Sequence, residues 1–299
     1  MVSRRPTDPS NRIALRQFQH HPRDWRNNLY VYPVISRRSG GLSIGINLNP
    51  DMACNFDCIY CQVDRTVAPR VRDVSLAKLR EELREMIASA QDGGLFADPA
   101  LHDVPAERRI IRDIAFSGDG EPTTCKVFRE SVELAAELRK EFALDSARIV
   151  LITDACYLTR PDVVAALGVM DANNGEIWAK LDAGTEEYYR LVNRPNFPLQ
   201  HVIENITAAA RVRPVVIQSL LLRLDSQGPD DRELRAYVER LREILRAGGR
   251  IKQVQVYTVA RRPAESNVTA LSDAEVDHIR DLVRAQTGLE ADSYYGVSL

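Results

Sequence analysis

The sequence contains no long apolar run, and both histidine and cysteine are scarce in it. Of its 299 residues, five are histidines and five are cysteines. No stretch approaches the roughly 20 apolar residues that cross a bilayer, and the arginine-rich N-terminus has no apolar segment typical of a secretory signal. We therefore expect a cytoplasmic protein without a membrane partner. So few cysteines in a chain of this length also argue against a disulfide framework.

The charge is nearly balanced overall but unevenly distributed. The formal net charge is −2, so the chain lacks the excess of positive charge that general nucleic-acid binding requires, and DNA is not an expected partner. Residues 1–40, however, carry eight arginines against two acids. This basic segment could contact the phosphates of an RNA, and the alternative interpretation is a solvated tail.

Three of the five cysteines, Cys54, Cys58 and Cys61, lie in one short segment, with three residues between the first pair and two between the second. Thiolates at this spacing can hold an iron–sulfur cluster from a single loop. Three ligands on a cluster of four irons leave one iron open to a substrate or cofactor. Zinc is the alternative, but it normally takes four ligands and no histidine lies next to the loop. Cys125 or Cys156 could supply a fourth ligand through the fold.

Strand and helix patterns alternate about six times along the chain. This order requires a parallel sheet with right-handed crossovers. We predict an α/β fold, namely a partial (β/α)6 TIM-like barrel with parallel strands. The expected units are a basic N-terminal extension (1–40), a barrel core (41–262) and a C-terminal helical extension (263–299). The expected strands are 29–35, 42–48, 110–116, 148–153, 176–181, 215–222 and 253–259.

A glycine-rich segment follows the expected strand 110–116. It contains Gly118 and Gly120, which allow a backbone to approach a ligand closely, and the acids Asp119 and Glu121. Barrels place their chemistry at the carboxyl ends of their strands, which is where this segment lies. An ordinary turn between a strand and a helix is the alternative interpretation.

Charged residues also lie at the end of the expected strand 176–181. Lys180 and Asp182 are two positions apart, so their side chains point to the same side of the strand. The pair could contact a ligand at the mouth of the barrel, or it could form a structural ion pair inside it.

Together these motifs resemble the radical S-adenosylmethionine (radical SAM) enzymes. The three-cysteine loop, with Tyr60 just before its last cysteine, and segments 118–122 and 180–184 occur in the order typical of that superfamily. The resemblance covers roughly residues 42–259. It is greatest with the branch containing the wyosine-type tRNA-modifying enzymes, but no cysteine lies upstream of Cys54 to hold the second cluster of those enzymes.

The resemblance implies a cofactor set and a role for each motif. It implies that a [4Fe-4S] cluster is held by Cys54, Cys58 and Cys61. It implies that S-adenosylmethionine (SAM) is held by Tyr60, Gly118, Asp119, Gly120, Glu121, Lys180 and Asp182. Of these, Tyr60 corresponds to a residue near the adenine, the glycine-rich turn to a motif for the SAM amino group, and the lysine–aspartate pair to contacts with the carboxylate and ribose.

The implied activity is reductive cleavage of SAM to a 5′-deoxyadenosyl radical, which abstracts hydrogen from an unidentified substrate, with RNA as one option. A one-electron donor such as a flavodoxin or ferredoxin is the implied partner. Two alternatives stay open at this point. One is a non-catalytic zinc or iron–sulfur protein that binds RNA, and the other is an activase that installs a glycyl radical on a partner protein.

Overall fold

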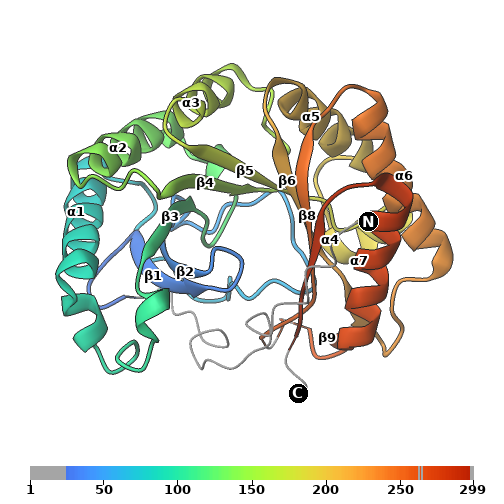
Figure 1. The fold of residues 1–299 in the computed structure, drawn as a ribbon, viewed down its shortest axis with the longest axis horizontal. Helices are drawn as coiled ribbons and strands as arrows, with labels where there is room; N and C mark the ends of the chain where they lie inside the picture. Colours follow the sequence, from blue (N-terminus) through green and yellow to red (C-terminus); the bar gives the residue numbers. More distant parts are fainter. Residues whose placement is uncertain (1–24, 262, 264, 297–299) are drawn as a thin grey trace.

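The computed structural model describes residues 25–261, 263 and 265–296 of the chain. Its main feature is an eight-stranded sheet in the order β1-β2-β3-β4-β5-β6-β8-β10. The sheet curls into an open barrel with helices around its outer side (Figure 1). Its strands are β1 Val31–Ser36, β2 Gly41–Ile46, β3 Ile111–Phe116, β4 Arg148–Thr153, β5 Gly175–Lys180, β6 Val215–Leu220, β8 Ile251–Tyr257 and β10 Ala291–Tyr294.

Within this sheet, every neighbouring pair of strands from β2 to β10 is parallel. Strand β1 alone pairs antiparallel in it, with Val31 opposite Ile46. All six residues of β2 and all six of β6 are buried. Burial on both faces is typical of parallel strands that are covered on each side. The predicted partial TIM-like barrel with parallel strands is therefore confirmed.

Amphipathic helices connect the strands and cover the outside of the sheet (Figure 1). Several begin at polar residues whose side chains accept a hydrogen bond from the first turn, such as Ser75, Asp230 and Ser272. No helix in the described ranges is long and apolar enough to cross a membrane. The helices are α1 Leu76–Asp92, α2 Phe128–Glu141, α3 Pro161–Asp171, α4 Glu186–Asn193, α5 Leu199–Val212, α6 Asp231–Arg246 and α7 Asp273–Thr287.

Some elements were not predicted from the sequence. Strand β10 pairs in parallel with β8, so the segment after residue 262 adds both α7 and a strand to the sheet. Two residues of β10, Asp292 and Ser293, interrupt the apolar pattern from which the other strands of the sheet are predicted. A separate two-stranded sheet joins β7 (Leu222–Leu224) to β9 (Val268–Ala270).

The proposed unit boundaries stay predictions. Strand β1 lies within residues 1–40 and pairs with β2. Most arginines of the basic N-terminal segment lie outside the described residues, which begin at residue 25.

Candidate active site

The three-cysteine loop leaves the carboxyl end of β2 and is fastened to the last residues of α4 and the segment directly after it. The amide of Ile59 donates to the carbonyl of Val192 at 3.0 Å, and that of Asp57 donates to the carbonyl of Asn193 at 3.1 Å. A short antiparallel bridge joins Phe56 to Pro195 next to these contacts. Segments about 135 residues apart in sequence therefore determine together where the cysteines lie.

The glycine-rich turn after β3 packs directly against the same loop. The amide of Glu121 donates to the carbonyl of Ala53 at 3.0 Å. A Cβ atom added to Gly120 would lie 1.9 Å from that carbonyl oxygen, and one added to Gly118 would lie 2.3 Å from Oδ1 of Asn47. Glycine is therefore required at both positions, because the glycine-rich turn packs directly against the cysteine loop and the end of β2. Any side chain at either position would force these segments apart.

Asp119 pairs with Asn47 rather than facing the cysteines. Asn47 Nδ2 donates to Asp119 Oδ2 at 2.6 Å, and the amide of Asp119 donates to Asn47 Oδ1 at 3.1 Å. Asp119 lines a neighbouring cavity of about 440 Å³ and not the one that the cysteines line. In this structure its side chain stabilises the turn. Asn47 was not predicted as a site residue.

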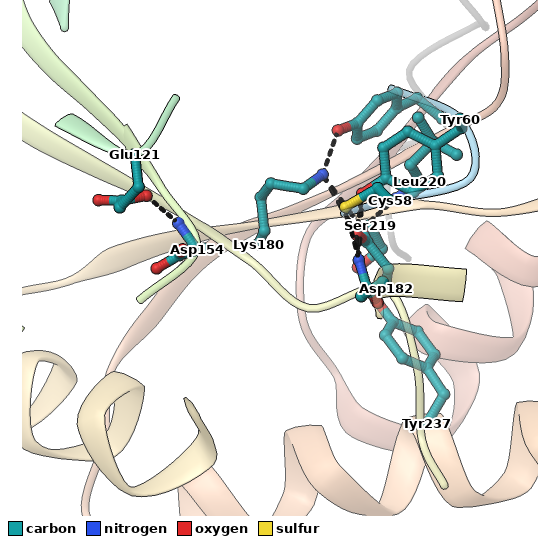
Figure 2. Close-up of polar contacts among 11 residues, drawn as sticks. Cys58, Tyr60, Glu121, Asp154, Lys180, Asp182, Ser219, Leu220 and Tyr237 are labelled. Carbon is teal, nitrogen blue, oxygen red and sulfur yellow. Dashed lines mark hydrogen bonds and ion pairs between the residues drawn. The ribbon is translucent and has the colours of Figure 1, made fainter. Parts of the chain in front are cut away.

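Glu121 is buried, and its carboxylate is held by the strand beside it. It accepts a hydrogen bond from the amide of Asp154 at 2.7 Å (Figure 2). The hydroxyl of Thr153 donates a second hydrogen bond to it, also at 2.7 Å. Burial, together with the negative charge of Asp154, raises the pKa of Glu121 well above its ordinary value. A cationic ligand group beside it would favour the ionised carboxylate.

Asp182 is the centre of a buried hydrogen-bond network at the end of β5 (Figure 2). It accepts from the hydroxyl of Tyr60 at 2.5 Å and from the amide of Leu220 at 2.8 Å. It also accepts from Nδ2 of Asn193 at 2.8 Å and lies 3.2 Å from Nζ of Lys180. Asp182 does not line the cysteine cavity, so its side chain positions its neighbours.

Lys180 carries a fixed positive charge to the edge of the cysteine cavity. Its Nζ donates to the hydroxyl of Tyr257 at 3.1 Å and lies 5.2 Å from the ring centre of Tyr60. Burial alone would lower the pKa of Lys180, but Asp182, Tyr257 and Cys58 together raise it above its ordinary value. The side chain therefore stays cationic and can attract a carboxylate.

The three cysteines differ in their surroundings. Burial raises the pKa of Cys58 to about 11, against the opposing effect of Lys180, and raises the pKa of Cys54 to about 12. Asn193 Nδ2 lies 3.4 Å from Sγ of Cys58, and Arg65 Nη1 lies 3.7 Å from Sγ of Cys61. Such donors to sulfur are among the features that tune an iron–sulfur cluster. Iron binding would replace the thiol protons.

One cavity of about 350 Å³ brings most of the predicted site together, and this volume is within the usual range of cofactor pockets. Cys125 and Cys156 do not line it. Within the described ranges, no three histidine, cysteine or acidic side chains gather closely enough to hold one metal ion. A cluster differs from a single ion because each thiolate binds a separate iron. The predicted residues that line the cavity are Cys54, Cys58, Cys61, Tyr60, Gly118, Gly120, Glu121 and Lys180.

Sequence reasoning missed the role of Asn193. Its amide nitrogen contacts Asp182, the hydroxyl of Tyr60 and the sulfur of Cys58. Asn193 ends a helix, and no local pattern distinguishes it from an ordinary helix terminus.

No family model matches the chain. Among curated proteins it is similar to the GTPase Obg of Brachyspira hyodysenteriae, with 23% identity over 269 residues. It is also similar to UPF0026 protein MJ1312 of Methanocaldococcus jannaschii, with 30% identity over 178 residues. These matches cover 87% and 59% of this chain. The chain spans only 34% and 48% of the lengths of these two relatives.

Solved structures that share the fold include the following two. Streptococcus suis SuiB, bound to S-adenosylmethionine, matches with a TM-score of 0.53 and 13% identity over 87% of this chain and 49% of its own. A cysteine-to-alanine mutant of spore photoproduct lyase, with a dinucleoside spore photoproduct, also matches with a TM-score of 0.53 and 13% identity. That match covers 82% of this chain and 74% of the lyase.

Proposed function

The chain has the fold of the radical SAM enzymes, and from this premise we propose that it binds a [4Fe-4S] cluster and SAM and cleaves SAM reductively. One observation supports the proposal above all others. The cysteine loop after β2, the glycine-rich turn after β3 and Lys180 on β5 all line a single cavity. When bound, the reduced cluster would supply the electron that cleaves the sulfonium and yields a radical able to abstract hydrogen from a substrate.

In this proposal the three thiolates hold the cluster, and the remaining iron is left for SAM. Asn193 would fix the orientation of Cys58, because its amide group bridges that sulfur and Asp182. The donors beside Cys58 and Cys61 would stabilise the extra negative charge of a reduced cluster.

Two charged side chains suit the amino-acid end of SAM. Lys180 would attract the carboxylate, since its ammonium stays charged at the cavity edge. Glu121 would attract the ammonium, whose charge would lower the raised pKa of that carboxylate. Tyr60, held by Asp182, would lie beside the adenine. Asp119 and Asp182 are positioning residues here, because neither lines the cavity.

The first test is the formation of 5′-deoxyadenosine. The full chain is reconstituted with iron and sulfide without oxygen, reduced with dithionite, mixed with SAM and analysed by mass spectrometry. We expect the product from the unaltered chain and none from Cys58→Ala. Cys125→Ala is the matched control, since this cysteine lies outside the cavity, and it should retain the product.

Full product formation by Cys58→Ala would contradict the proposal. A colourless protein that takes up zinc in place of a cluster would support a non-catalytic RNA-binding role. We further propose a flavodoxin or ferredoxin as the electron donor and the cytoplasm as the location. The substrate is left open, with RNA as one option, and adding total tRNA to the assay would test it.

A further inference from the structure

The cysteine cavity extends along the barrel interior to the turn between β1 and β2. There Arg37 and Arg38 line it, together with Arg261 from the segment that follows β8. Nη1 of Arg37 donates to the carbonyl of Tyr295 at 2.7 Å, directly after β10. The turn therefore reaches across from one edge strand of the open barrel to the other, and it carries two arginines to the opening.

Arg38 is held by two aromatic rings. Its guanidinium carbon lies 5.6 Å from the ring centre of Trp178 on β5 and 5.1 Å from that of Tyr257 on β8. Stacked rings restrict the orientation of a guanidinium without occupying its N–H donors. No acidic side chain among the described residues forms an ion pair with Arg38. Tyr257 also accepts a hydrogen bond from Lys180, so Arg38 lies close to the proposed SAM site.

The surroundings of Arg38 favour a bound anion. Burial and the neighbouring charges of Arg38 and Arg261 lower the pKa of Arg37 to about 10. The indole N–H of Trp178 is buried and has no acceptor in the structure. An unpaired buried donor is unfavourable, and an anionic oxygen would pair with it. Asp113, the nearby acid that lines the cavity, is 3.5 Å from Arg148.

We propose that Arg38, with Arg37 and Arg261 around it, binds an anionic oxygen group of the substrate, either a phosphate or a carboxylate. The inference rests on the proposed function, because the bound molecule would be the one presented to the SAM site. A guanidinium offers paired N–H donors that match both groups. The extra strand β1 would thus supply the substrate subsite of this barrel.

Trp178 provides a direct reporter for the test. The chain has two tryptophans, Trp25 and Trp178, so Trp25→Phe leaves only the one that contacts Arg38. The full reconstituted chain is titrated with inorganic phosphate and, separately, with succinate, at constant ionic strength. We expect a saturable change in Trp178 emission. Calorimetry on the unaltered chain gives an independent dissociation constant.

Substitutions at Arg38 make the test specific. Arg38→Gln should weaken binding by about tenfold or more, because charge-assisted hydrogen bonds are lost. Arg38→Lys should retain part of the affinity, since it keeps the charge but not the paired donors. Arg84→Gln is the control, because Arg84 also lies over a ring, that of Phe142 at 5.8 Å, but does not line the cavity.

Saturable binding of only one probe would identify the anionic group as phosphate or as carboxylate. No saturable binding of either probe, or unchanged binding in Arg38→Gln, would overturn the inference. Loss of phosphate and succinate binding when SAM is present would assign the arginines to SAM instead. Formation of 5′-deoxyadenosine by the unaltered chain is measured separately. Anion binding without this product would refute only the proposed function, and the product without anion binding would refute only the subsite.

Discussion

At the scale of single residues, the site depends on contacts that tolerate no added atoms. Gly120 illustrates this, because the carbonyl of Ala53 occupies the place where its Cβ would lie. Gly120 therefore contributes to the site by allowing the cysteine loop to lie against the glycine-rich turn. It has no side chain that could take part in the chemistry.

Gly120→Ala should therefore separate the glycine-rich turn from the cysteine loop. We expect a loss of about 1–3 kcal/mol of stability, as for other forced contacts in packed regions, and a lower iron content after reconstitution. Gly168→Ala is the control, because Gly168 lies within helix α3 with open space around it. It should be neutral or slightly stabilising. Thermal unfolding and iron analysis measure both effects, and equal behaviour of the two variants would refute the explanation.

Asn193 acts through three partners at once. Asn193→Ala removes donors to Asp182, Tyr60 and Cys58. Because Asp182 is buried, we expect a loss of about 1–3 kcal/mol, together with a shift in the reduction potential of the reconstituted cluster. Asn267→Ala, which removes an exposed contact to Asp225, should change neither quantity. An unaltered potential in Asn193→Ala would show that the contact with Cys58 has no effect on the cluster.

At the scale of elements, helix α1 determines the position of β1, the first strand of the barrel. Glu82 of this helix is fully buried and accepts hydrogen bonds from the amides of Leu29, Tyr30 and Val31, at 2.8, 2.9 and 3.2 Å. One carboxylate thus fixes the start of β1 against the helix. Because β1 leads to Arg37 and Arg38, the same contact supports the proposed anion subsite.

Glu82→Ala should destabilise the protein by roughly 3–5 kcal/mol, because the three amides, two of them in buried contacts, lose a charged acceptor. Glu85→Ala, an exposed position of the same helix, should change stability by less than about 0.5 kcal/mol. Urea unfolding of both variants measures the difference. Similar midpoints would show that water replaces the carboxylate at little cost and that β1 is held mainly by its pairing with β2.

At the scale of the whole molecule, the site exists only because three strand ends converge. Lys180→Met tests this convergence, since it removes the fixed charge at the cavity edge while keeping the length of the side chain. We expect SAM to bind the reconstituted variant about tenfold more weakly or worse, as for other lost charge-assisted contacts. Lys140→Met, at an exposed position on α2, is the control. Calorimetric titration with SAM measures both, and equal affinities would exclude Lys180 from the SAM site.

Local patterns were sufficient for most of the barrel. The strands β2 to β6 and β8 are short, largely apolar runs bounded by turn residues, and their predicted positions agree with the structure to within a few residues. Strand β10 escaped prediction because it is only four residues long and includes Asp292 and Ser293. Short mixed segments become strands when a neighbour such as β8 offers a free edge, which is a property of the assembled sheet.

The sequence by itself determined the alternation that leads to a parallel barrel, the three-cysteine spacing and the polar residues at the strand ends, because each of these is a local pattern. Only the tertiary structure decided that Asp119 and Asp182 position their neighbours, that Asn193 contacts Cys58, and that Arg38 lines the cavity. The physical reason is that these contacts join residues far apart in sequence. Their geometry follows from the packing and curvature of the whole sheet, which no local pattern encodes.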